Sequence, residues 1–186
     1  FQRRSPLQRR LADLLERETS AGLVGPRLVY GNGAAQSSRR RFPTLPMGLM
    51  ESTLAEHWFP HNRWARRYHL DDVPDEHTQD VDWVTGACML VRRAALDQIG
   101  LFDEGFFMYS EELDLCKRLR SAGWRVVYLP QATVVHYEGQ SSGQVAARRQ
   151  LLFDSSKVRY FRKHVGLINA EVLRLALLGG YVFSLL

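Results

Sequence analysis

The chain has 186 residues, of which 45% are hydrophobic and 24% charged; these values are ordinary for a globular domain and exclude a fibrous repeat or disorder over most of the length. Its 25 Lys and Arg against 20 Asp and Glu give a net charge of +5, which would suit nucleic acid, anionic lipid or phosphorylated substrates alike. Two cysteines, Cys88 and Cys116, do not make a disulfide scaffold, so a reducing compartment is expected.

The N-terminal part predicts one helix and one strand. A serine-proline pair is typical of a helix start, and leucines follow at helical spacing, so residues 6–18 should form an amphipathic helix. Apolar residues within 23–30 predict a strand that ends in the turn Gly31-Asn32-Gly33. Residues 34–80 lack such regularity, and we expect a surface excursion with one short helix near 47–57.

Regular structure returns at Val81. The run 83–91 is apolar apart from Thr85, which predicts one continuous buried strand. The pattern then predicts a helix over 93–99 that Gly100 ends. A second helix is expected after Ser110, which would cap it, with Leu113, Cys116 and Leu119 on its inner face and Gly123 at its end. Strands over 124–129 and 133–137 on either side of Pro130 and a basic helix over 144–164 should follow.

Strands alternating with helices indicate a mixed α/β fold. The few predicted strands are thin for a complete α/β enzyme. The sequence also begins at Phe1 rather than Met and ends inside the apolar run 172–186. We therefore expect the chain to be part of a longer protein.

Four blocks between residues 81 and 142 carry the functional information. They are DWVTGACMLVRR (82–93), GLFDEGFFMYSEELDLCKR (100–118), GWRVVYLP (123–130) and VVHYEGQSS (134–142). Their order and spacing resemble the C-terminal half of family 2 glycosyltransferases, in the rhamnosyltransferase-like branch. The resemblance implies a GT-A fold, which is a Rossmann-like nucleotide-diphospho-sugar transferase fold, with the N-terminal nucleotide-binding half missing from this chain.

The same resemblance implies an inverting transfer of a hexosyl or rhamnosyl group in cell-wall or polysaccharide biosynthesis. The donor would be a nucleotide-diphosphate sugar, and the acceptor a hydroxyl of a polysaccharide or of a lipid-linked saccharide. A divalent cation, Mg²⁺ or Mn²⁺, would assist the leaving diphosphate, and this chain alone would be inactive. The alternative is a degenerate, non-catalytic module of the same fold that binds glycan or lipid. Nucleic acid is not an expected partner, because no aromatic-basic signature of a known module is present.

The catalytic base is expected at the acidic pair Glu111-Glu112. A carboxylate at a helix N-terminus is held ionised by the helix dipole and free amides, and a base must be ionised. From spacing alone, the pair is better explained as acids that simply favour a first helical turn. The resemblance implies that the second acid, Glu112, is the base, with Glu111 as second choice. The family has aspartate at this second position, so the glutamate here is one methylene longer.

The resemblance also implies roles for four further residues. His136, at a strand end, would contact the cation or diphosphate, since imidazole is a competent metal ligand; a plain polar residue is the alternative. Trp83, Gly86 and Asp114 would lie at the substrate pocket, although core packing explains Trp83, and a strand kink Gly86, nearly as well.

The segment Asp80-Val81-Asp82 looks like the D-x-D metal motif of nucleotide-sugar enzymes. It lies downstream of the place where that motif belongs, and short motifs often match by chance. We therefore expect the true D-x-D before Phe1.

We divide the chain into a partial GT-A domain over 1–164, which holds the acceptor and catalytic half, and an apolar C-terminal helix over 165–186. The apolar run is too short to span a bilayer alone, since about 20 residues are needed. An interfacial helix or the start of a cut membrane span is one interpretation, and a core-packing helix is the other. Arginine clusters at 3–10, 39–41 and 63–67 fit anionic lipid or a solvated face. We expect a cytoplasmic protein, peripheral at the inner face of the cell membrane.

Overall fold

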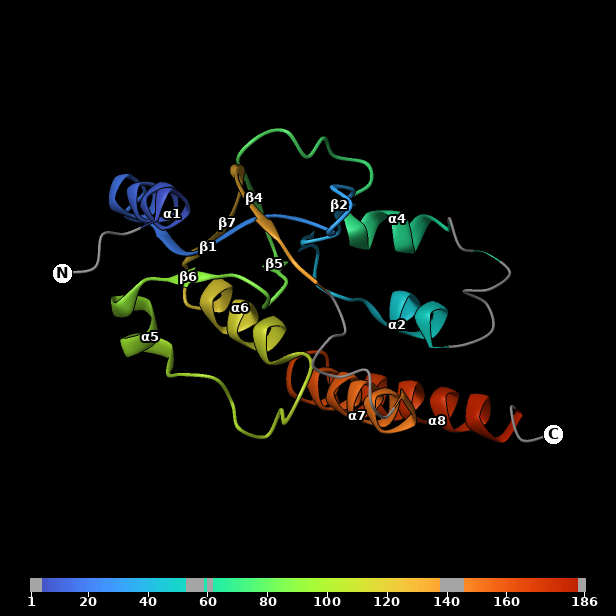
Figure 1. Cartoon of the computed structure of the whole chain (residues 1–186). Helices are drawn as coiled ribbons and strands as arrows, with labels where there is room; N and C mark the ends of the chain where they lie inside the picture. Colours follow the sequence, from blue (N-terminus) through green and yellow to red (C-terminus); the bar gives the residue numbers. More distant parts are fainter. Residues whose placement is uncertain (1–4, 53–58, 60–61, 138–145, 184–186) are drawn as a thin grey trace.

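Two long strands form the centre of the fold in the computed structural model, which describes residues 5–52, 59, 62–137 and 146–183 (Figure 1). β1 (Ala21–Val29) runs parallel to β7 (Arg125–Val135) along most of its length. β1 is buried on both faces over most of its length, and β7 over Val126–Pro130, which explains the nearly continuous apolar sequence of these parts. The predicted strand over 23–30 is thereby confirmed.

Five short strands complete two sheets. The main sheet has the order β2-β1-β7-β4, and β6 pairs with β1, while β3 and β5 form a separate pair. The short strands are β2 (Ala35–Gln36), β3 (Arg39–Arg40), β4 (Gln79–Val81), β5 (Trp83–Val84) and β6 (Leu90–Val91). The expected mixed α/β fold is therefore confirmed.

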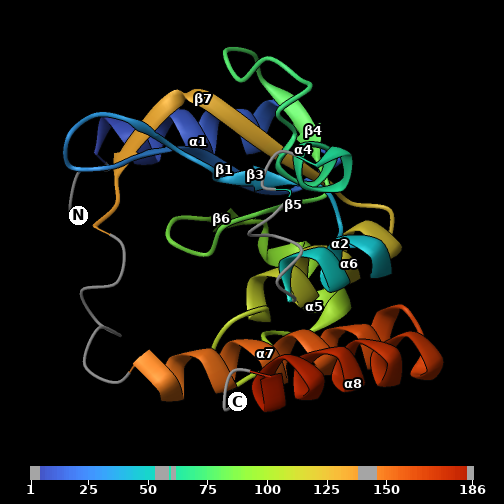
Figure 2. The same ribbon diagram turned by 90° about the vertical axis from the view of Figure 1, so that its right-hand side faces the viewer.

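One face of the main sheet is covered by α1 (Pro6–Arg17) (Figure 2). The helix begins with a capping box, in which Ser5 accepts from the Gln8 amide and the Gln8 side chain accepts from the Ser5 amide. Its leucines Leu11, Leu14 and Leu15 are buried against one side of the sheet. The helix predicted over 6–18 is confirmed, and the spacing of its leucines is the reason it packs on the sheet.

The opposite face of the sheet carries a layer of shorter helices (Figure 2). These are α2 (Leu45–Glu51), α5 (Arg93–Ile99) and α6 (Glu111–Ser121), while α4 (Arg63–His69) packs against α2 and β3 at the edge of the sheet. α6 is central, because Leu115, Cys116 and Leu119 are fully buried in the larger core cluster. The predicted inner face of this helix and the predicted helix over 93–99 are confirmed.

Beneath this layer lie α7 (Ala146–His164) and α8 (Leu167–Phe183), two long helices packed against each other. Phe161 and Leu173 are fully buried between them and the layer above. Gly48 of α2 permits this approach, since a Cβ there would stand 3.1 Å from the Phe161 ring. Among the described residues, no helix combines the length and apolarity needed to cross a membrane.

Two sequence expectations about strands are wrong, and one expected helix has different bounds. Residues 83–91 form two short strands, β5 and β6, in different sheets, because residues 85–89 leave the strand path between them. β7 runs unbroken past Pro130, with a register shift against β1 in place of a break. The helix near 47–57 already begins at Leu45 and ends at Glu51, and residues 53–58 lie outside the described residues.

α4 was not expected from the sequence. Its start is signalled by Asn62, whose side chain accepts from the Trp64 and Ala65 amides. The helix is short and carries several arginines, so its apolar periodicity is weak, and only Tyr68 is buried within it.

Candidate functional site

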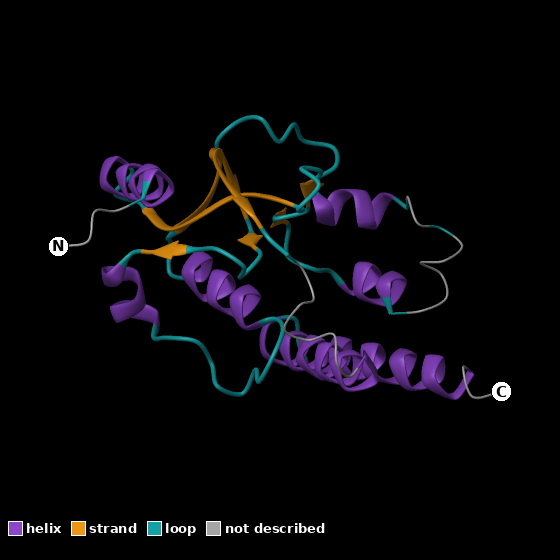
Figure 3. Ribbon diagram, in the orientation of Figure 1, coloured by secondary structure: helices purple, strands orange, loops and turns teal. Residues whose placement is uncertain are grey.

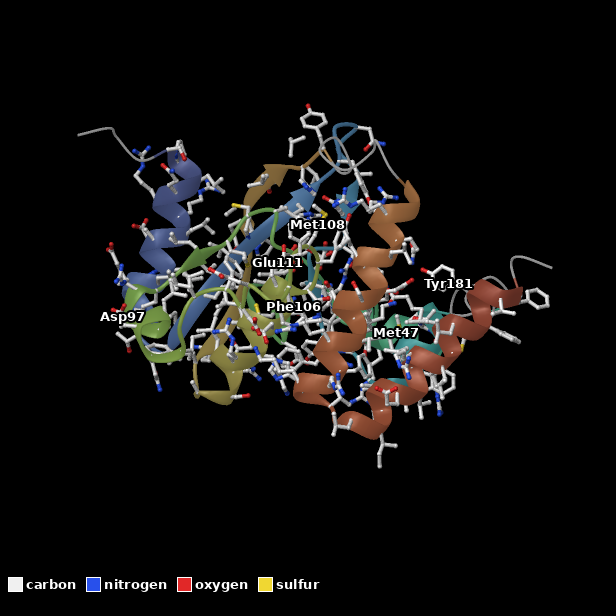
Figure 4. The ribbon with its side chains drawn as sticks, turned by 90° about the horizontal axis from the view of Figure 1, so that it is seen from below. Met47, Asp97, Phe106, Met108, Glu111 and Tyr181 are labelled. Carbon is white, nitrogen blue, oxygen red and sulfur yellow. The ribbon has the colours of Figure 1, made fainter. Side chains whose placement is uncertain are left out.

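A cavity of about 530 Å³ opens at the N-terminus of α6. Its walls come from the loop after β5 (Gly86 and Met89), from the loop between α5 and α6, and from the first turn of α6. Four carboxylates and three phenylalanines line it: Asp103, Glu104, Glu111, Glu112, Phe102, Phe106 and Phe107. Figure 3 shows how long the loop between α5 and α6 is, and Figure 4 places Phe106 and Glu111 close together beside α7. The acidic pair predicted from the sequence thus borders a cavity.

The backbone before α6 is strained. Tyr109 and Ser110 both adopt left-handed conformations, with φ of 68° and 65°, which non-glycine residues rarely do. Ser110 occupies the N-cap position, but its side chain makes no capping hydrogen bond, so the expected serine cap is wrong. Two consecutive left-handed residues turn the chain sharply into the helix, and the acidic pair follows at once.

Glu112 lies at the wall of the cavity, and its two carboxylate oxygens have different surroundings. Its Oε1 accepts from the Gly86 amide at 3.4 Å. Its Oε2 is buried and has no hydrogen-bond partner among the described residues, and Glu111 has an Oε2 in the same condition. A buried acceptor without a partner is costly unless something else meets it.

The pKa of Glu112 is raised, because the side chain is buried and the carboxylate of Glu111 lies nearby. The hydrogen bonds from the Glu112 and Gly86 amides, and the charge of Arg40, oppose this shift but do not cancel it. The expectation that the helix N-terminus keeps this carboxylate readily ionised is therefore wrong in direction. A carboxylate with a raised pKa binds a proton more tightly, which makes it the stronger base.

Gly86 is placed where its backbone reaches Glu112. A Cβ at this position would stand 3.4 Å from the Glu112 Cβ, so a larger side chain would crowd the carboxylate. The chain leaves β5 after Val84, and the Gly86 amide in the loop that follows donates to Glu112 of α6.

Trp83 does not reach the cavity. It is buried, its Nε1 donates to the Arg41 carbonyl at 2.9 Å, and the Arg40 guanidinium lies 5.0 Å from its ring centre. These contacts fit the core-packing alternative better than a place at the substrate.

Asp114 also lies away from the cavity, contrary to the expectation from the resemblance. Its carboxylate is 0% exposed and accepts from Arg118 at 2.8 Å, from Lys163 at 2.7 Å and from His164 at 2.7 Å. Burial pushes its pKa up, but the hydrogen bonds from Lys163, His164 and Arg118 outweigh burial and leave the pKa lowered. Asp114 ties α6 to α7 and has no free oxygen for a ligand.

His136 follows the end of β7, and its Nδ1 pairs with the Gln36 Oε1 at 2.9 Å. No group of three His, Cys, Asp or Glu that could hold a metal ion occurs among the described residues, and residues 138–145 after His136 lie outside them. A cation site around His136 therefore does not follow from the residues that the structure places.

The acids of Asp80-Val81-Asp82 have structural partners. Asp80 accepts from Arg125 at 2.8 Å, and Asp82 accepts from the Phe42 amide at 2.8 Å. These contacts agree with the view that this segment is not the metal motif.

The sequence did not predict the hydrogen bonds of Asp103 that hold the loop between α5 and α6. Asp103 accepts from the Gly105 amide and from Lys163 of α7, both at 2.8 Å. The hydrogen bonds from Lys163 and the Gly105 amide lower the pKa of Asp103 to about 2. Lys163 reaches Asp114 as well, so one ammonium joins the cavity wall to α6. Only the phenylalanine-rich run around Asp103 could have signalled a role for this loop.

A second cavity, of about 490 Å³, lies between α1 and β7. Of its charged residues, Arg125 is paired with Asp80 and Glu18. It contains none of the candidate catalytic, substrate-binding or metal-binding residues named from the sequence, so the cavity at α6 remains the candidate site.

Comparison with known proteins gives a family. The family described as "Glycosyltransferase like family 2" matches residues 36–152, which include β5, the loop between α5 and α6, and α6 itself. The acidic pair and Gly86 therefore both lie inside the matched region.

Curated relatives point the same way. The chain is 41% identical over 135 residues to the N-acetylglucosaminyl-diphospho-decaprenol L-rhamnosyltransferase of Mycobacterium tuberculosis, covering 72% of this chain and 43% of the relative. It is 47% identical over 57 residues to Rhamnosyltransferase WbbL of Escherichia coli, covering 31% of this chain and 22% of the relative. The chain thus spans less than half the length of these relatives.

Proposed function

Because the chain belongs to glycosyltransferase family 2, we propose that it forms the acceptor-side catalytic part of an inverting sugar transferase. The proposed donor is a nucleotide-diphosphate sugar, with rhamnose as the favoured sugar, since two relatives are named rhamnosyltransferases. The proposed acceptor is a hydroxyl of a saccharide carried on a lipid diphosphate, as in the name of the mycobacterial relative. Such an acceptor is held in a membrane, and we propose the cytoplasmic face of the cell membrane as the place of reaction.

Glu112 carries this proposal, because its Oε2 is buried at the cavity wall without a partner among the described residues. In the proposed step, this oxygen takes the proton of the acceptor hydroxyl while the hydroxyl oxygen bonds to the anomeric carbon of the donor. The bond from that carbon to the diphosphate breaks, and the diphosphate leaves with the electron pair. The Gly86 amide holds the other oxygen and so fixes the carboxylate. The raised pKa favours proton uptake.

The phenylalanines of the cavity supply apolar faces against which the rings of a sugar can lie. Gly86 keeps its proposed place beside the substrate, whereas Trp83 and Asp114 are not proposed as substrate contacts. A divalent cation, Mg²⁺ or Mn²⁺, remains part of the proposal for the leaving diphosphate, with His136 as its candidate ligand from this chain. Among the described residues, no group of three His, Cys, Asp or Glu completes a site for this cation. We also expect this chain alone to be inactive, since it spans 43% of the mycobacterial relative.

The test is Glu112→Gln in the full-length protein, with transfer followed from nucleotide-diphosphate rhamnose to a lipid-linked diphospho-N-acetylglucosamine. Loss of a general base lowers turnover by about 10²–10⁴-fold. Two matched controls line the same cavity. Glu104→Gln should keep most activity. Glu111→Gln removes a like charge, so it should lower the pKa of Glu112 and move the acid limb of the pH profile to lower pH.

Wild-type turnover in Glu112→Gln would remove this residue from the base role. If the parent protein transfers no sugar and still binds the acceptor, the non-catalytic module becomes the better description.

A further inference from the structure

We call the side of the molecule formed by α7, α8 and the loop over 101–108 the underside. It exposes many large apolar side chains to solvent. α8 buries Ala170, Leu173 and Leu177. The opposite side of the helix carries Ile168 and Leu175, which are 80% and 61% exposed, and the apolar stripe continues through Leu167, Val172, Leu178, Val182 and Phe183. At 17 residues, the helix is about 25 Å long, so the stripe is an extended face.

The loop between α5 and α6 adds aromatic side chains on the same side. Leu101 and Phe107 are 73% and 74% exposed, and Phe102 and Met108 are exposed as well. In Figure 1 this loop descends to the level of α7, and Figure 4, seen from below, shows Met108 and Phe106 beside α7. Exposed apolar side chains in this number on one side of a molecule mark a site of association.

The positive charge of the chain is concentrated in the same two helices. α7 and α8 together hold seven Lys and Arg against two Asp and Glu, a net charge of +5, which equals the net charge of the whole chain. Part of this charge is matched by acids of neighbouring segments, since Lys157 pairs with Glu51, and Arg159 and Lys163 pair with Asp103. Arg148, Arg149 and Arg162 are exposed on α7, whereas Arg174 of α8 is paired with Glu171.

We propose that this underside docks on an anionic phospholipid bilayer. An apolar helix face next to an arginine-rich face is the arrangement of helices that lie in the plane of a membrane interface, where phenylalanine and leucine enter the acyl boundary and basic side chains meet lipid phosphates. The excess of basic charge favours an anionic bilayer over a second copy of this chain, whose underside would carry the same positive charge. The inference goes beyond the proposed sugar transfer, and it sets the cavity at α6 beside the bilayer.

The test is co-sedimentation of the full-length protein with vesicles, at low salt, without donor or acceptor. We expect binding to vesicles of equal parts phosphatidylcholine and phosphatidylglycerol, and weaker binding to phosphatidylcholine alone. Arg148→Gln and Arg162→Gln should each weaken binding to the anionic vesicles by roughly fivefold. Arg66→Gln, on the exposed side of α4, is the matched control and should bind as wild type.

The apolar face is tested with Ile168→Ser combined with Leu175→Ser. Both side chains are largely exposed, so we expect unchanged unfolding temperature and loss of binding to both kinds of vesicle. Val135→Ser, an exposed valine of β7, is the control. If the double variant unfolds early, Leu101→Ser provides a second apolar change outside the helices and outside the cavity lining.

Equal binding by wild type and the underside variants, or no binding of wild type to anionic vesicles, would overturn the proposal. A lipid-free dimer that the Ile168/Leu175 variant abolishes would assign the face to a second copy instead. Glu112→Gln should bind vesicles as wild type, so failure of docking and failure of the catalytic proposal are distinguishable.

Discussion

At the scale of single residues, Glu112 is held in a state that costs stability. Its raised pKa means that folding disfavours the ionised side chain, so its contribution to stability is present below the ordinary glutamate pKa and is lost as the pH rises through the raised value. We expect Glu112→Gln to raise the unfolding temperature at neutral pH, while the proposed transfer is lost. Thermal unfolding followed by circular dichroism across the acid range checks this.

The gain in Glu112→Gln should shrink as the pH falls and the wild-type carboxyl becomes protonated. Glu104→Gln, at an exposed position, serves as the control with little change at any pH. An unfolding temperature of Glu112→Gln that lies below wild type at neutral pH would contradict the burial argument.

The acidic pair could be located from the sequence, but its surroundings could not. Glu111 and Glu112 follow a strong helix start and lie in a recognisable sequence block, so their place at a helix N-terminus was predictable. The direction of the Glu112 pKa shift depends on burial and on a carboxylate neighbour in space. Asp114 stands two positions further on and faces α7 instead, because successive helical residues point in different directions.

At the scale of elements, α6 and α7 are joined through Asp114, which receives Arg118, Lys163 and His164. We expect Asp114→Asn to lower the free energy of unfolding by about 3 kcal/mol, since it leaves cations around a neutral buried group. The contribution of Asp114 should be present above the ordinary aspartate pKa and lost as the pH falls through its lowered value. Urea unfolding at several pH values measures both effects.

The matched control is Asp97→Asn in α5. Asp97 pairs with Arg93 at the same i,i+4 spacing and at 2.7 Å, but both side chains are largely exposed. Exposed pairs contribute about 0.5 kcal/mol or less. Similar losses in the two variants would show that Asp114 is not the buried junction described above.

Helices with a clear apolar period, such as α1 and α6, were predictable, whereas the region over 83–91 was not. The sequence of an apolar run does not show whether its residues form one strand or are divided between two sheets. The division depends on pairing of β5 with β3 and of β6 with β1, and these partners are distant in the sequence. α4 was missed because its short arginine-rich sequence gives little apolar period.

At the scale of the whole molecule, two hydrophobic clusters share one sheet. Leu23 and Val126 point into the cluster under α6 to α8, whereas Val24 and Val127 point into the cluster under α1. Since both clusters use neighbouring residues of β1 and β7, we expect the described chain to unfold in one transition. Leu14→Ala and Leu173→Ala should each lower the free energy of unfolding by about 2–5 kcal/mol.

Tryptophan fluorescence and far-ultraviolet circular dichroism should give coincident unfolding curves for wild type and for both variants. Ile168→Ala, at an exposed position of α8, is the control that should change little. A separate early transition in Leu14→Ala would show that α1 and its cluster unfold on their own.

The exposed arginines of α7, Arg148, Arg149 and Arg162, place basic charge on the underside of the molecule. A negatively charged membrane attracts this side of the protein before contact and rotates the protein, so that α7 and α8 meet the membrane first. The cavity at α6 is then already oriented beside the membrane. Higher ionic strength should then lower mainly the rate at which the protein associates with the membrane in the correct orientation. Dissolved ions screen the charges and so shorten the distance at which the rotation begins.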